Sequence, residues 1–89
     1  MPGTALRRQR LQAAFDHASE RFRRDDAKAA IVIAELVEKH GAIYRAGRDP
    51  NRLSVAGVAA SCTWSADTGL LQNWIRTAAV RLMIPAEDA

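Results

Sequence analysis

Apolar side chains recur at helical spacing through residues 4–40, a stretch that contains no Gly and no Pro. Its first part carries an apolar stripe at spacings of four, three and four residues, formed by Leu11, Phe15, Ala18 and Phe22. Its second part is apolar on nearly every side and ends at Gly41, a residue suited to the left-handed C-terminal cap of a helix. The pattern predicts two helices, over about residues 4–24 and 26–40, with a break near Asp25. One continuous helix used in dimerisation is the alternative.

Residues 41–53 have a composition typical of turns, with Gly47 and Pro50 close together. Pro50 suits the second position of a turn because its ring fixes the φ angle. We therefore expect a loop through this segment. A short hairpin that pairs residues 43–44 with residues 53–55 is the alternative.

Capping signals predict two further helices in the last third of the chain. Ser54 is a suitable N-cap for a short helix over about residues 54–62, and Ser65 for a longer helix over about residues 66–83. The longer helix has one broad apolar face, formed by Leu70, Leu71, Trp74, Ile75, Ala78 and Leu82. An acidic tail, residues 85–89, follows. The fold predicted from these elements is all-α, a small single domain of four helices.

A pattern associated with DNA binding spans the two predicted C-terminal helices. The sequence VAGVAA at residues 55–60, followed by WSADT at residues 64–68, resembles the helix-turn-helix family of DNA-binding domains. It departs from the family pattern at Thr63, where a turn glycine is usual, and at Gly69, where a core aliphatic residue is usual. The resemblance implies a C-terminal helix-turn-helix-like unit in a transcriptional regulator or accessory factor, with its second helix in the DNA major groove.

The charge of the chain favours an anionic partner. The chain contains 13 basic residues, 11 of them Arg, and 10 acidic residues. The planar guanidinium group suits bidentate contacts with phosphate, carboxylate or guanine. Duplex DNA is therefore the favoured partner. The alternative is a small helical inhibitor or adaptor of phage or plasmid type that engages an acidic protein surface. Because 89 residues with an Ala-rich apolar fraction form a small core, we also expect a homodimer.

Candidate contacts with DNA follow from the polar positions of the predicted elements. Gln and Asn can bond adenine edges and Arg can bond guanine, so the expected base-reading residues on the last helix are Gln72, Asn73 and Arg76. Other hydroxyl and arginine side chains are suited to phosphate contacts. These are Ser65 and Thr68 at the last helix, Arg10, Arg21 and Arg24 on the first helix, and Arg48 and Arg52 in the loop. For the first helix the alternative is a solvated face with a Glu20–Arg24 ion pair.

The chain offers little for catalysis or metal binding. Cys62 lies among small apolar residues with no His nearby, so it is expected to be a buried apolar side chain. His17 and His40 lack the spacing of a helical metal site. We expect no enzymatic activity, no cofactor and no metal. Because neither a secretion signal nor a membrane-spanning apolar run is evident, a cytoplasmic protein without a membrane partner is expected.

The two tryptophans are expected in the core. Both Trp64 and Trp74 have apolar neighbours in the sequence. For Trp64 the alternative is an exposed ring that anchors a partner.

Overall fold

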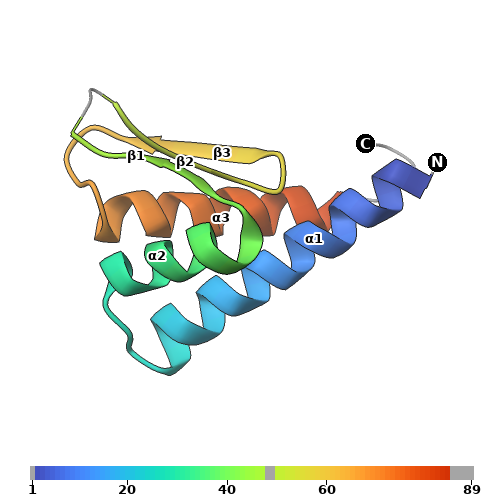
Figure 1. The fold of residues 1–89 in the computed structure, drawn as a ribbon, viewed down its shortest axis with the longest axis horizontal. Helices are drawn as coiled ribbons and strands as arrows, with labels where there is room; N and C mark the ends of the chain where they lie inside the picture. The colour runs from blue at the N-terminus through green and yellow to red at the C-terminus, as the bar shows by residue number, and fades with distance from the viewer. Residues whose placement is uncertain (1, 48–49, 85–89) are drawn as a thin grey trace.

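The computed structural model describes residues 2–47 and 50–84, with side chains from residue 6 onward. Within these residues an antiparallel three-stranded sheet packs on a layer of helices (Figure 1). The elements in chain order are α1 (Pro2–Ser19), a π-helical turn η1 (Glu20–Arg24), α2 (Ala29–His40), β1 (Ile43–Arg45), β2 (Asn51–Val55), β3 (Val58–Cys62) and α3 (Thr68–Met83). The fold is α+β, so the predicted all-α, four-helix architecture is wrong.

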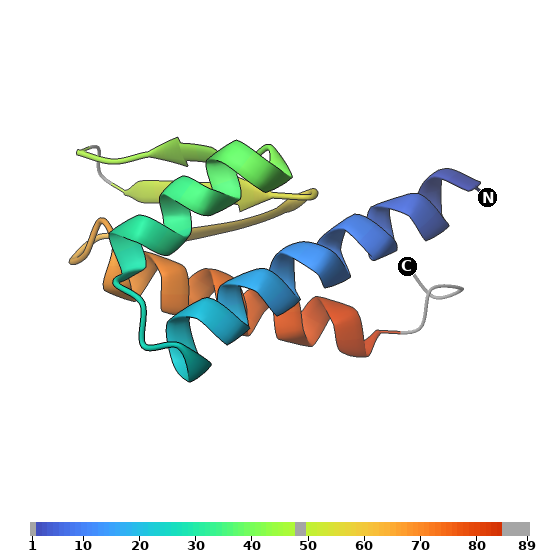
Figure 2. The same cartoon turned by 60° about the horizontal axis from the view of Figure 1, so that its bottom comes forward.

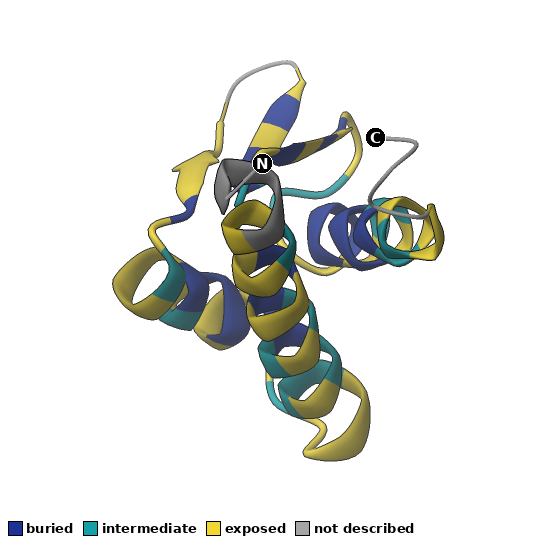
Figure 3. Cartoon of the chain, turned by 90° about the vertical axis from the view of Figure 1, so that its right-hand side faces the viewer, coloured by how far each residue is buried: buried dark blue, intermediate teal, exposed yellow. Residues whose placement is uncertain are grey.

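The helices cover one face of the sheet. Figures 1 and 2 show α2 and α3 beneath the strands, with α1 running alongside them. Burial alternates along β2 and β3, so that every second side chain, including Leu53 and Cys62, faces the helices. The burial predicted for Cys62 is confirmed. The opposite sheet face is exposed to solvent (Figure 3).

The predicted helix over residues 54–62 is instead the end of β2, a turn and β3. Ala56 and Gly57 have φ angles of 51° and 83°, and two such left-handed residues form the tight turn of a two-residue hairpin. Val55 and Val58 flank the turn as Cα partners on the buried face. Because these residues are strands, the helix-turn-helix-like unit is not formed.

Residues 41–53 also differ from the predicted loop. β1 pairs with β2, so Ile43 lies opposite Ser54 and Tyr44 opposite Leu53. This is the hairpin considered as the alternative. It makes β2 the central strand and places β1 and β3 at the two edges.

The predicted break between the first two helices is confirmed. The turn η1 ends where the Asp25 N–H donates to the Glu20 carbonyl at 2.8 Å, and Asp26 then adopts a left-handed φ of 55°. The second helix begins at Ala29, three residues later than predicted. Gly41 caps its C-terminus with a φ of 67°, as expected.

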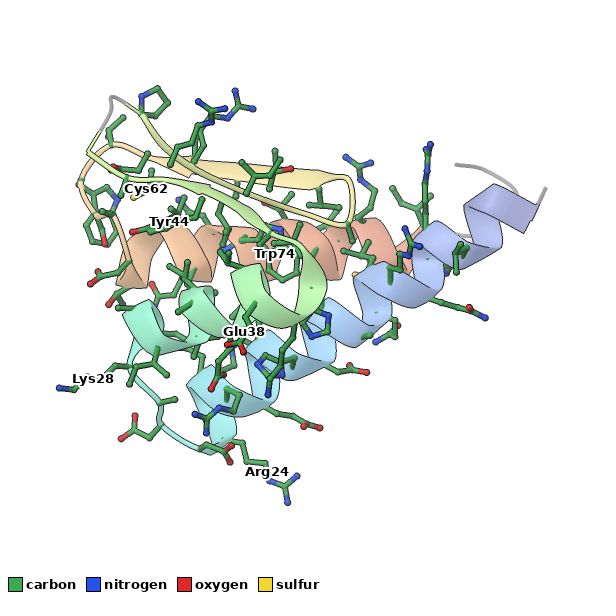
Figure 4. All side chains as sticks on the ribbon, in the orientation of Figure 1. Arg24, Lys28, Glu38, Tyr44, Cys62 and Trp74 are labelled. Carbon is green, nitrogen blue, oxygen red and sulfur yellow. The ribbon has the colours of Figure 1, made fainter. Side chains whose placement is uncertain are left out.

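The helix α3 connects the sheet to the first helix. It begins at Thr68 with Asp67 as N-cap, rather than at residue 66 with Ser65 as N-cap. Its apolar face is buried largely as predicted, and Trp74 is completely buried between the helices and the sheet (Figure 4). The Trp74 Nε1–H donates to the Val58 carbonyl at 3.0 Å, which fixes α3 against β3.

The first and last elements pack against each other. Small or branched residues on the inner side of α1, Leu11, Ala14 and Ala18, are buried in the core. The guanidinium group of Arg8 donates to the carbonyls of Leu82 and Ile84, at the C-terminal end of α3. The core is therefore completed by two helices from opposite ends of the chain.

Candidate functional site

A polar groove of about 400 Å³ runs between β3 and α3. Side chains from β2, β3 and one side of α3 line it: Arg52, Ala59, Ala60, Ser61, Asn73, Arg76 and Thr77. We call this the β3–α3 groove. Its two charged side chains are both arginines, and both are exposed. The groove is thus suited to an anionic ligand.

A row of donors extends the groove across the open face of the sheet. The strand register places Arg45 opposite Arg52, and Arg52 opposite Ser61, so that the three side chains point to the same face. Adjacent strands are separated by about 4.8 Å. We call Arg45, Arg52 and Ser61 the cross-strand row. Two like charges directly opposite each other disfavour strand pairing, so this arrangement costs stability.

The predicted base-reading residues lie in or beside the groove. They differ in whether their side chains are exposed or held by a hydrogen bond. Arg76 and Gln72 are exposed on α3. Asn73 is partly buried, and its Nδ2 donates to the Ser61 carbonyl at 3.0 Å, which covers part of the free edge of β3. Thr77 donates its hydroxyl to the Asn73 carbonyl at 2.8 Å. Asn73 and Thr77 therefore fix the wall of the groove, while Arg76 extends from it.

The N-terminus of α3 is satisfied by the protein itself. The Ser65 hydroxyl accepts from the Gly69 N–H at 2.9 Å, and the Asp67 carboxylate accepts from the Thr68 N–H. The carboxylate also places a negative charge where a phosphate would have to approach. Ser65 and Thr68, predicted as phosphate contacts, are thus part of a helix cap.

The arginines predicted on the first helix fall into two groups. Arg21 forms a bidentate pair with Glu35, with Nε–Oε1 and Nη2–Oε2 distances of 3.0 and 3.1 Å, and also contacts Asp25. Arg10 and Arg24 are exposed, and Arg24 extends away from the body of the protein (Figure 4). The i,i+4 ion pair of this segment is Arg21–Asp25. Arg48 lies outside the described residues.

Glu35 is the centre of a charged cluster between α1, η1 and α2. Its Oε1 lies 2.9 Å from Nε2 of His17 and also accepts the bond from Nε of Arg21. The hydrogen bonds from Arg21, followed by that from His17, lower the pKa of Glu35 despite its partial burial. The His17 ring lies 5.2 Å from the His40 ring, and burial, followed by the charges of His17 and Lys39, lowers the pKa of His40.

Charges in the groove lack such partners. Within residues 6–47 and 50–84, the ion pairs involve Arg21 and His17, and none involves Arg45, Arg52 or Arg76. In the same residues no group of three His, Cys, Asp or Glu side chains is arranged to hold a metal ion. No helix in the described part of the chain has the length and hydropathy needed to cross a membrane.

Comparison with known proteins adds no family to this picture. No protein-family model, no curated protein and no solved structure matches the chain. The chemistry of the site is therefore argued from its own residues.

Sequence reasoning missed Arg45, and it placed Trp64 in the core with an exposed ring only as the alternative. Arg45 lies opposite Arg52 in the cross-strand row only because β1 pairs with β2, and a strand pairing was considered there without its side-chain register. Trp64 is 75 % exposed, so the core position predicted for it is wrong. Its indole lies over Gly69, which is buried. A side chain at position 69 would collide with the ring, which accounts for Gly in the first turn of α3.

Proposed function

We propose that the protein binds nucleic acid through the β3–α3 groove and the cross-strand row. The observation that carries this proposal is the placement of Arg45 directly opposite Arg52 on an uncovered sheet face. Folding alone gains nothing from this repulsion, whereas a phosphate bound between the two guanidinium groups would remove it.

The rest of the groove supports the same class of ligand. Arg76 reaches the groove from α3, and the exposed Ser61 hydroxyl lies beside Arg52 in the cross-strand row. Arginine and hydroxyl groups are common phosphate contacts in protein–nucleic acid complexes. Strands as well as helices are used to approach nucleic acid, so the loss of the helix-turn-helix layout does not remove this function. In the described residues from Gly41 to Met83, Asp67 is the one carboxylate.

Salt-dependent binding tests the proposal. The measurement is the fluorescence anisotropy of labelled mixed-sequence oligonucleotides, both single-stranded and duplex, titrated with the protein at several salt concentrations. Three phosphate contacts predict a slope of log K against log salt of about −2 to −3. The absence of binding to either form at low salt would refute the proposal. Binding of an acidic peptide in that case would favour the protein-binding alternative.

The expected homodimer has a contact surface on the outer side of α2. Ile31 and Val37 are 48 % and 43 % exposed there. Lys28 lies at the start of α2 and Glu38 near its end, so an antiparallel second copy would bring opposite charges together. Light scattering should give the mass of a dimer for the natural chain and of a monomer for Ile31→Glu. A monomeric natural chain at high concentration would refute this assembly.

A further inference from the structure

The indole ring of Trp64 packs over Gly69 although most of the ring is exposed, so burial in the core does not explain its position. A Cβ atom at position 69 would lie 2.6 Å from Cζ2 and Cη2 of Trp64 and 2.9 Å from Cβ of Ser65, so only glycine fits beneath this part of the loop. Yet three quarters of the Trp64 side chain remains in solvent. The helix thus accommodates a ring that adds little to the core.

The loop that carries Trp64 is held at several points. The buried Asn51 side chain donates from Nδ2 to the carbonyls of Cys62 and Ser65, at 2.9 and 3.4 Å. The Tyr44 hydroxyl donates to the Ala66 carbonyl. These contacts fix the backbone on both sides of Trp64. The backbone that carries the ring is therefore in place before any partner arrives, which lowers the entropy cost of binding.

Gly69, over which the Trp64 ring lies, is on the same side of α3 as the groove. Gly69, Asn73 and Arg76 are separated by four and three residues, so they follow one another along one face of the helix. The rise from Gly69 to Arg76 is about 10 Å. That length corresponds to about three stacked nucleotides at about 3.4 Å each.

We propose that Trp64 is a stacking platform for an unpaired base, and that the ligand of the groove is single-stranded nucleic acid. This inference rests on the proposed function. A base stacks on Trp64 while the phosphates that follow it along the strand contact Arg76, Arg52 and Arg45. Within a duplex both faces of each base are covered by neighbouring bases, so the ring of Trp64 would have no surface to contact.

The test compares three probes and several variants. The probes are a labelled mixed-sequence single strand, the same sequence as a blunt duplex, and a closed-circular duplex without ends. The variants are Trp64→Ala, Trp64→Phe and Gly69→Ala, with Val80→Ala as the matched control because Val80 is an exposed apolar residue farther along α3. Circular dichroism and thermal unfolding establish that each variant is folded.

The single strand should bind at least about tenfold more tightly than the closed circle, and Trp64→Ala should weaken its binding by about 5- to 100-fold. Trp64→Phe should restore part of the affinity, and Val80→Ala should leave it unchanged. Gly69→Ala should reduce affinity by displacing the ring, and adding it to Trp64→Ala should cause little further loss. Stacking should also quench the part of the tryptophan emission that comes from Trp64, which Trp64→Phe removes while the emission of buried Trp74 remains.

Equal affinity for the single strand and the closed circle would overturn the inference while leaving the proposed function intact. The same holds if Trp64→Ala retains full affinity and full strand preference. Preference for the blunt duplex over the closed circle, without tighter binding of the single strand, would show end binding and also overturn it. Failure of all three probes to bind would instead overturn the proposed function, and this inference with it.

Discussion

The two halves of the molecule use their arginines differently. In the helical half, formed by α1, η1 and α2, Arg21 is bound to Glu35 and Asp25. In the half formed by the sheet and α3, Arg52 and Arg76 lie in a groove without a carboxylate partner among the described residues. The local sequence differs as well, since Glu20, Asp25 and Asp26 lie close to Arg21, whereas no charged residue lies within four positions of Arg76. Whether a guanidinium group is available to a ligand is thus decided by the carboxylates that the tertiary fold brings to it.

The largest expected effect comes from reversing the charges of the groove. Arg52→Glu combined with Arg76→Glu should reduce nucleic-acid affinity by at least about a hundredfold, because two charge-assisted contacts are replaced by repulsion. The matched control is Arg10→Glu combined with Arg24→Glu, which changes net charge equally on the helical half. Anisotropy titrations at one salt concentration measure both. If both double variants lost affinity equally, binding would depend on net charge alone, and the groove would not be the specific site.

Removing a charge from the cluster around Glu35 in the helical half should lower stability without lowering affinity. Glu35→Gln leaves Arg21 and His17 without their shared carboxylate, so the melting temperature should fall by a few degrees while nucleic-acid affinity stays constant. Glu20→Gln, at an exposed position in η1, is the control and should change neither. If Glu35→Gln instead lost affinity at unchanged stability, the ligand would bind the helical half, and the proposed site in the groove would be wrong.

Acid should destabilise the protein through the same cluster. The pKa of His40 is lowered from 6.5 in the folded protein, so its stabilising contribution is present above pH 6.5 and is lost as the pH falls below that value. The pKa of Glu35 is lowered from 4.5, so its contribution is lost at more acidic pH, below 4.5. The urea midpoint should therefore decline in two stages. His40→Gln should flatten the first and Glu35→Gln the second, and a midpoint that rises on acidification would contradict both assignments.

The smallest expected effect concerns backbone strain in each half. Ala56 in the sheet and Asp26 in the helical half both have left-handed φ angles, 51° and 55°. Asn tolerates this conformation better than Ala but no better than Asp, so Ala56→Asn should stabilise the protein by about 0.5–1 kcal/mol and Asp26→Asn should have little effect. Urea unfolding measures the difference. An unchanged midpoint for Ala56→Asn would show that the turn carries no relievable strain.

Local signals in the sequence predicted part of the fold. The break near Asp25, the Gly41 cap and the buried face around Trp74 depend on residues within one or two helical turns of each other. The hairpin of β2 and β3 was missed because Ala56-Gly57 is a weaker turn signal than Asn-Gly, and because Ala59 and Ala60 suit a helix as well as a strand. The fold class was wrong for this reason.

The candidate site was less predictable, since it depends on pairings between distant residues. Arg52 and Arg76 were identified as candidates, but their approach to each other required the sheet. The partner of Arg21 is Glu35, fourteen residues away and on another helix. Trp64 was assigned to the core because its neighbours in the sequence are apolar. Its ring comes to lie over Gly69 only when the loop folds back onto α3.

The packing of α1 against α3, and the contacts of Arg8 with Leu82 and Ile84, have a consequence during protein synthesis. The first helix leaves the ribosome long before α3, so its apolar face lacks this native partner until α3 has been synthesised. The sheet likewise lacks α3, which covers its inner face. We therefore expect the native core to form only once α3 has emerged, and a nascent chain stalled before residue 68 should remain a substrate for chaperones.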